Sequence, residues 1–291
     1  MKRYLTLFYV LLLVLLSACN GKSSQKEENK RLIMVTMEPQ RYFTEAIAGD
    51  KFLVESMVPK GSSPETYDPT PQQLTRLSKS EAYLRIGHIG FEQSWMDRLT
   101  DNAPHMQIFD TSKGVELIHG EGHNHGDHFH AGGVDPHIWN SISNARIIAK
   151  NTFQALITLD KTNENYYLHR YDSLCKVINH IDSVINNTFQ TSKADHAFMI
   201  YHPALSYFAR DYGLHQICIE EEGKEPSPAH LRDLIEICKE EEVRIIFVQP
   251  EFDRRNAEII AKQTNTNIVD VNPLSYNWEK EMIHIANSLC K

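Results

Sequence analysis

Five of the fifteen histidines lie within the segment His119–His130, which reads HGEGHNHGDHFH. Glycine, asparagine and acidic residues separate most of them, and the segment has no apolar periodicity that would pack a helix or a strand against a core. Imidazoles and carboxylates on a flexible backbone are typical of a weak, multivalent site for a borderline metal such as zinc. The alternative is a solvated polar loop, but the number of histidines favours a metal-binding loop. Its ligands would be His119, His123, His125, His128 and His130.

The N-terminus has the features of a secretory signal. A basic start precedes the apolar run Tyr4–Leu16, which is too short to be a stable membrane anchor, and small residues then lead to Cys19. We predict a signal peptide over residues 1–18 and a tether over residues 19–30, because Cys19 resembles the lipidated cysteine of a bacterial lipobox. The alternatives are an uncleaved anchor and a buried free cysteine. The mature protein is therefore expected outside the cytoplasm, in the periplasm or at the cell surface, held to a membrane by lipid.

Charge and cysteine usage narrow the possible functions. The formal net charge of −8 argues against nucleic acid as a partner and fits a cationic ligand. The remaining cysteines, Cys175, Cys218, Cys238 and Cys290, show no CxxC pairing, so a thiolate zinc site is not expected. In an oxidising compartment a disulfide can form. We expect Cys238 to pair with Cys290, because both lie late in the chain.

Strand and helix patterns alternate on both sides of one long helical segment. The alternation predicts an N-terminal α/β lobe over residues 31–162 and a C-terminal α/β lobe over residues 191–291, each with a mostly parallel sheet. Residues 163–190 contain no proline or glycine and repeat apolar residues at helical spacing, which predicts a connecting helix roughly 40 Å long. A coiled-coil dimer is the rival interpretation, and a monomer is preferred. Ligands in such lobes bind beyond the carboxyl ends of the strands.

Short motifs run in a fixed order along nearly the whole mature chain. They are Pro59-Lys-Gly61, Tyr67-Asp-Pro-Thr-Pro71, Gly87 to Glu92 with Trp95, Asp135-Pro-His-Ile-Trp139, Tyr201-His-Pro-Ala204 with Tyr207-Phe208 and Tyr212-Gly-Leu214, and Pro273-Leu274. In this order they resemble the ZnuA/TroA type of solute-binding protein, the metal-binding subunit of bacterial ABC importers of zinc or manganese. The resemblance implies two α/β lobes joined by one long rigid helix, with the metal in the cleft between the lobes.

The resemblance also implies a metal sphere with one ligand from each of four places. His137 and His202 match the second and third places, and imidazole suits zinc. At the first place, where many members have histidine, this chain has Glu65, whose carboxylate is an acceptable zinc ligand. The alternatives are a helix-capping role for His137, a core role for His202 and a solvated surface role for Glu65.

The fourth place departs from the family pattern. Members usually have aspartate before Pro-Leu, but this chain has Asn272, and asparagine is a poor zinc ligand. Asp270 lies two residues earlier, on the same face if the strand continues. The site would use Asp270 or Asn272, keep water as its fourth ligand, or recruit another carboxylate such as Glu92 or Glu251.

The sequence therefore predicts an extracytoplasmic subunit of an ABC importer that captures Zn²⁺ and delivers it to a membrane permease. Mn²⁺ or Fe²⁺ is the alternative cargo, because a carboxylate at position 65 suits harder ions. A surface zinc scavenger or adhesin without a transporter is a second alternative. A zinc hydrolase is the third, but the chain has no HExxH and no nucleophile elbow, so no enzyme is expected.

Overall fold

The N-terminal lobe is built on a four-stranded parallel sheet. The structure is a computed structural model, and it describes residues 30–120, 123–125, 128–130, 133–192, 195–221 and 223–290. Its strands are β1 (Arg31–Val35), β2 (Phe52–Ser56), β3 (Ala82–Arg85) and β4 (Gln107–Asp110), in the order β2-β1-β3-β4. The expected signal peptide and Cys19 lie outside the described residues. Among the helices that are described, none is both long enough and apolar enough to cross a membrane.

Both faces of this sheet are covered by helices, as its apolar strands require. Leu32 and Met34 of β1 face α4 (Pro71–Leu77) and α5 (Gly90–Asn102), with which they share a core cluster. Ile33 and Val35 point to the opposite face, because side chains alternate along a strand. There they pack in a second cluster with α3 (Glu38–Ala48) and α6 (Ile142–Leu159).

The C-terminal lobe repeats this plan. Its parallel strands are β7 (Ala197–Ile200), β8 (His215–Cys218), β9 (Ile245–Val248) and β10 (Asn267–Asp270), in the order β10-β9-β7-β8. One face packs on α9 (Pro228–Glu240) and α10 (Arg255–Thr264), and the other on α8 (Ser206–Tyr212) and α11 (Trp278–Ser288). The two-lobe α/β architecture expected from the sequence is therefore confirmed.

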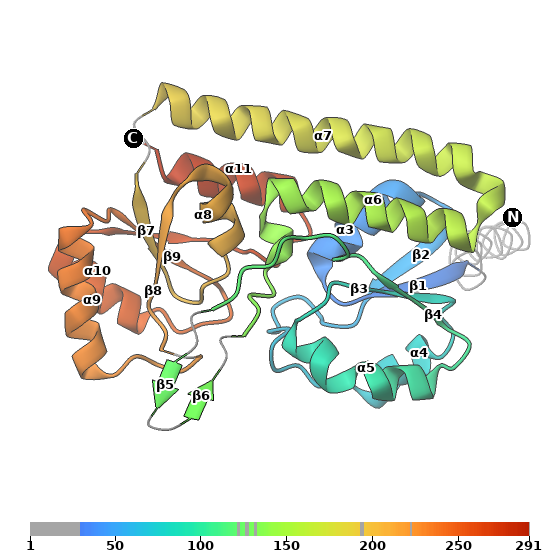
Figure 1. Cartoon of the computed structure of the whole chain (residues 1–291), viewed down its shortest axis with the longest axis horizontal. Helices are drawn as coiled ribbons and strands as arrows, with labels where there is room; N and C mark the ends of the chain where they lie inside the picture. The colour runs from blue at the N-terminus through green and yellow to red at the C-terminus, as the bar shows by residue number, and fades with distance from the viewer. Residues whose placement is uncertain are drawn as a thin grey trace, which may run out of the picture.

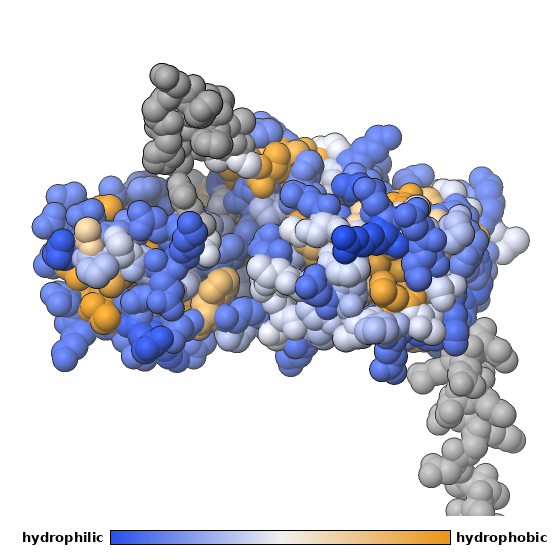
Figure 2. Space-filling model, turned by 90° about the horizontal axis from the view of Figure 1, so that it is seen from below, coloured by the Kyte–Doolittle hydropathy of each residue, from blue (hydrophilic) through white to orange (hydrophobic). Residues whose placement is uncertain are grey.

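The helix α7 (Glu164–Thr191) runs along both lobes (Figure 1). Its 28 residues correspond to roughly 42 Å of helix. It contacts α3 and α6 of the first lobe and α11 of the second, and Tyr167, Leu174, Ile178, Ile181 and Ile185 are its buried residues. These residues belong to one apolar cluster that also includes strand residues of both sheets. The face opposite α7 is mostly hydrophilic, with small separate hydrophobic areas (Figure 2).

Two local features differ from the sequence-based expectation. The histidine-rich segment, expected as a loop, contains the short antiparallel strands β5 (His123–His125) and β6 (His128–His130). An antiparallel ribbon pairs its own backbone groups and needs no apolar periodicity. The expected disulfide is not formed. Cys238 lies on the buried face of α9, with its thiol 3.4 Å from the hydroxyl of Thr266, whereas the thiol of Cys290 faces the Thr188 carbonyl in the last turn of α7, so both are free.

Candidate metal centre

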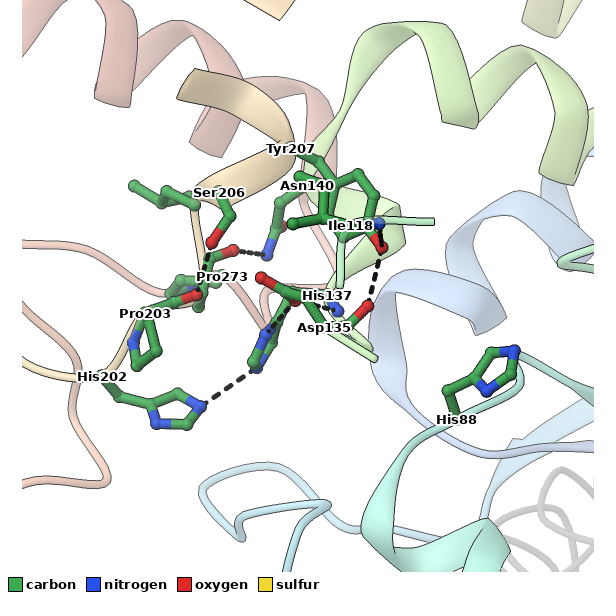
Figure 3. Close-up of polar contacts among 12 residues, drawn as sticks. His88, Ile118, Asp135, His137, Asn140, His202, Pro203, Ser206, Tyr207 and Pro273 are labelled. Atoms are coloured by element: carbon green, nitrogen blue, oxygen red, sulfur yellow. Dashed lines mark hydrogen bonds and ion pairs between the residues drawn. The ribbon is translucent and has the colours of Figure 1, made fainter. Parts of the chain in front are cut away.

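Three side chains from three separate loops converge where the two lobes meet. They are Glu65, His137 and His202, and each offers a ligand atom within 4.8 Å of the other two. The Nε2 atoms of the two histidines are 3.0 Å apart and point toward each other (Figure 3). The Oε1 atom of Glu65 lies 4.0 Å from Nε2 of His137. The structure thus brings together three of the residues that the sequence singled out as ligands.

His137 is held by the residue two positions before it. Oδ1 of Asp135 accepts a hydrogen bond from the backbone N–H of His137 at 2.9 Å and lies 2.8 Å from its Nδ1. Burial raises the pKa of Asp135, but the hydrogen bonds from His137 and Ser206 and the charge of His137 outweigh it and leave the pKa below its ordinary value. The Asp-Pro-His sequence therefore fixes both the backbone and the ring.

His202 follows β7 and is fixed from three directions. Nδ1 lies 2.8 Å from Oε1 of Glu220, which follows the neighbouring strand β8. The Gln249 amide, after β9, accepts from the backbone N–H of His202 and donates to its carbonyl. The ring of Phe252 stacks on the imidazole with 5.1 Å between centroids.

Glu65 is placed by the start of α5. The backbone N–H groups of Gly90 and Phe91 donate to Oε2 of Glu65 and to the carbonyl of Pro64, at 3.1 and 2.8 Å. A helix N-terminus favours a carboxylate. Only glycine fits at position 90, since a Cβ there would lie 2.4 Å from the Glu65 carbonyl oxygen. Oε1 of Glu65 is buried and has no hydrogen-bond partner in the part of the chain that is described.

This geometry suits a divalent cation. Each Nδ1 faces a carboxylate, an arrangement that in a neutral imidazole directs the lone pair of Nε2 toward the other histidine and toward a cation bound between them. Two nitrogens bound to one tetrahedral zinc at about 2.0–2.1 Å would be about 3.3–3.4 Å apart. The histidines would therefore separate by about 0.3–0.4 Å, and Glu65 would approach by about 0.6 Å, starting from the observed 3.0 and 4.0 Å.

Three of the other candidates for the fourth place lie outside this cluster and have other partners. Asp270 has a 76% exposed side chain and pairs with Arg254 at 3.3 Å. Oδ1 of Asn272 accepts from the backbone N–H of Leu274 at 3.1 Å, which turns the chain. Glu92 is 3% exposed and binds the backbone N–H groups of Ile86 and Gly87 and the Thr36 hydroxyl, so it shapes a loop instead.

The histidine-rich segment leaves the lobe close to the cluster. His119 pairs with Val134 across its base, immediately before Asp135, and Gly120 and Gly133 line the same large cavity as the three converging residues. The side chains of His123, His125, His128 and His130 lie outside the described residues.

Sequence reasoning missed the two orienting carboxylates, Asp135 and Glu220. Asp135 was within the Asp-Pro-His motif, and its spacing from the histidine was the available signal. Glu220 could have been found from topology, because the carboxyl ends of neighbouring parallel strands meet at the same edge of a sheet.

The junction between the lobes is tied by indole groups. Nε1 of Trp139 donates to the Pro273 carbonyl, and Nε1 of Trp278 donates to the Trp139 carbonyl, both at 2.8 Å. Two α/β lobes that one long helix holds together, with three ligand side chains where they meet, define a two-lobe metal-binding protein of the solute-binding class.

Comparisons with known proteins agree. Residues 33–289 match the family model described as zinc-uptake complex component A, periplasmic. The metal ABC transporter substrate-binding lipoprotein FimA of Streptococcus parasanguinis is 30% identical over 276 residues, covering 91% of this chain and 86% of FimA. The manganese ABC transporter substrate-binding lipoprotein PsaA of Streptococcus pneumoniae is 29% identical, with the same coverage.

Solved structures support the same assignment. The crystal structure of ZnuA has a TM-score of 0.82 and 32% identity, and the match covers 89% of this chain and 98% of that one. The Mn²⁺ complex of FpvC from Pseudomonas aeruginosa has a TM-score of 0.75 at 22% identity and shares the fold. The chain belongs to the zinc-uptake complex component A family of substrate-binding proteins of metal ABC importers, which are not enzymes.

Proposed function

We propose that this protein captures Zn²⁺ at the cluster of Glu65, His137 and His202 and delivers it to the membrane permease of an ABC importer. The observation that carries the proposal is the pair of facing Nε2 atoms, 3.0 Å apart, with a partly buried carboxylate behind each imidazole at Nδ1. Two imidazoles and one carboxylate favour zinc over manganese, which prefers oxygen ligands. The printed names of relatives include both metals, with manganese for PsaA and zinc uptake for the family model.

The metal site is tested by titrating metal-free protein with Zn²⁺ against a chromophoric chelator. His137→Ala and His202→Ala should each weaken binding by orders of magnitude. His169→Ala removes an exposed histidine of α7 and should bind as the unchanged protein does. Equal affinity in all four proteins would refute the assignment of the site.

The choice of metal is tested by the same titration with Mn²⁺. We expect zinc to bind more tightly, in keeping with the order of divalent-metal affinities at nitrogen-containing sites. Tighter binding of Mn²⁺ would refute the zinc assignment and leave the metal site intact. Loss of zinc uptake by cells that lack the protein would separate an importer subunit from a surface scavenger.

Two further parts of the proposal concern the lipid anchor and the histidine-rich segment. We propose that Cys19 is lipidated and holds the protein outside the cytoplasm, and that the segment His119–His130 collects zinc near the cleft. The polar composition of residues 20–30 and the position of the segment's base beside Asp135 support these roles. Cys19→Ser should move the protein from the detergent phase to the aqueous phase in a partition experiment.

A further inference from the structure

Among the described residues, the three-residue cluster leaves one coordination position of a tetrahedral ion without a protein ligand. A protein ligand for this position would come from the walls of the cavity around the cluster, and water is the alternative. The carboxylates that line the two cavities at this point are Glu65, Asp135, Glu220 and Glu251. Glu65 already belongs to the cluster, and Asp135 and Glu220 hold the Nδ1 atoms of the two histidines.

Glu251 is the carboxylate on these walls without an assigned role. It is partly buried, and within the described ranges no other side chain makes a hydrogen bond or an ion pair with it. Burial raises the pKa of Glu251, while its own backbone N–H and the charge of His202 act in the opposite direction. The carboxyl group is therefore partly buried on the same cavity wall as His202.

The position of Glu251 is set by its neighbours in the chain. Gln249, two residues before it, makes two hydrogen bonds to the backbone of His202. Phe252, directly after it, stacks on the His202 ring at an interplanar angle of 18° and on Tyr201 at 26°. Both contacts fix the turn after β9 to the residue that carries a metal-binding nitrogen. The carboxylate of Glu251 lies on the cavity wall outside the three-residue cluster, so it would reach the ion through a movement of this turn.

We propose that Glu251 supplies the fourth ligand when a divalent cation binds, so that the ion is held by two imidazoles and two carboxylates. This inference rests on the proposed function, since it assumes an ion at Glu65, His137 and His202. Two carboxylates neutralise the charge of the ion and add oxygen donors, which harder ions such as Mn²⁺ prefer. Glu251 would thus decide how well the site accepts manganese beside zinc.

The test compares Glu251→Gln and Glu251→Ala with Asp253→Asn, which removes one exposed negative charge from the same turn. Zn²⁺ and Mn²⁺ affinities are measured by competition, and X-ray absorption of the zinc-loaded proteins counts the oxygen and nitrogen atoms around the ion. Loss of a ligand should weaken Zn²⁺ binding at least as much as loss of an orienting partner does, about tenfold or more. Mn²⁺ binding should weaken further, and the absorption spectrum should change.

Asp253→Asn should retain the affinity and the spectrum of the unchanged protein. Equal Zn²⁺ affinity in Glu251→Gln, or weaker binding with the same zinc environment, would overturn the inference. His137→Ala is measured alongside: if it loses tight binding while Glu251→Gln does not, the proposed function stands and only the role of Glu251 is wrong. If His137→Ala also binds normally, the proposed function itself fails. Thermal unfolding of each metal-free variant checks that the fold is kept.

Discussion

Replacement of Asp135 tests whether orientation of His137 contributes to metal affinity. Its Oδ1 atom lies 2.8 Å from Nδ1 of His137, and the two side chains are 15% and 8% exposed, so solvent screens this contact little. Asp135→Asn keeps an oxygen in place and removes the charge, whereas Asp135→Ala removes the contact. The hydroxyl of Tyr207 still holds the backbone carbonyl of residue 135 in both variants.

The expected magnitude follows from the strength of this hydrogen bond. A bond to a charged group contributes about 1.5–3 kcal/mol and a neutral one about 0.5–1.5 kcal/mol. Asp135→Asn should therefore cost about 1–1.5 kcal/mol of binding free energy, which is about five- to tenfold in the dissociation constant. Asp135→Ala should raise the dissociation constant for Zn²⁺ about 10- to 100-fold, as the loss of an orienting partner does at other metal sites.

The assay is a competition titration with Zn²⁺ at fixed pH and salt. Asp172→Asn makes the same change of charge at an exposed position of α7 and serves as the control. If Asp135→Ala binds zinc no more weakly than Asp172→Asn, the idea that the carboxylate orients His137 for the metal is refuted. A larger loss for Asp135→Asn than for Asp135→Ala would also contradict it.

Three further outcomes are expected. Deletion of residues 120–130 should lower the zinc stoichiometry measured by native mass spectrometry but leave one tight site; loss of all binding would contradict the cleft assignment. Burial raises the pKa of Glu92 above its ordinary value of 4.5. The fold should therefore lose stability as the pH rises from about 4.5 through the higher folded-state pKa, because the buried carboxyl group then ionises. Denaturant unfolding of Glu92→Gln should show a weaker dependence of the unfolding free energy on pH, and an unchanged dependence would contradict this. Ile178→Ala on α7 should lower the free energy of unfolding by about 2–5 kcal/mol, because Ile178 is fully buried. Leu168→Ala, at a 42% exposed position of the same helix, should change it by less than about 0.5 kcal/mol. Equal effects of the two substitutions would contradict the buried role of Ile178.

Much of the fold was accessible from the sequence, because parallel strands buried on both faces and an uninterrupted 28-residue helix leave strong periodic patterns. The convergence of Glu65, His137 and His202 could also be anticipated, since each follows or precedes an element whose end faces the cleft. The exposed position of Asp270 outside the cluster could not be anticipated, because its contact with Arg254 depends on side-chain directions at the end of β10.

Other features depended on distances between segments far apart in the chain. Cysteine spacing did not reveal that Cys238 and Cys290 lie against different parts of the structure. The strands β5 and β6 were missed because their pairing is satisfied by backbone groups alone and leaves no apolar pattern. The sequence named Glu251 beside Glu92 as a further carboxylate but could not choose between them, because the place of Glu251 on the cavity wall depends on the stacking of Phe252 on His202.

The apolar cluster along α7 has a consequence for how the molecule unfolds. Residues of both sheets and of α3, α6, α8 and α11 belong to this one cluster, and α7 lies across it. Removal of either lobe would expose the apolar residues of α7 and one face of the remaining sheet to water. The two lobes therefore form a single cooperative unit, which should melt in one transition, and neither half should be stable when expressed alone.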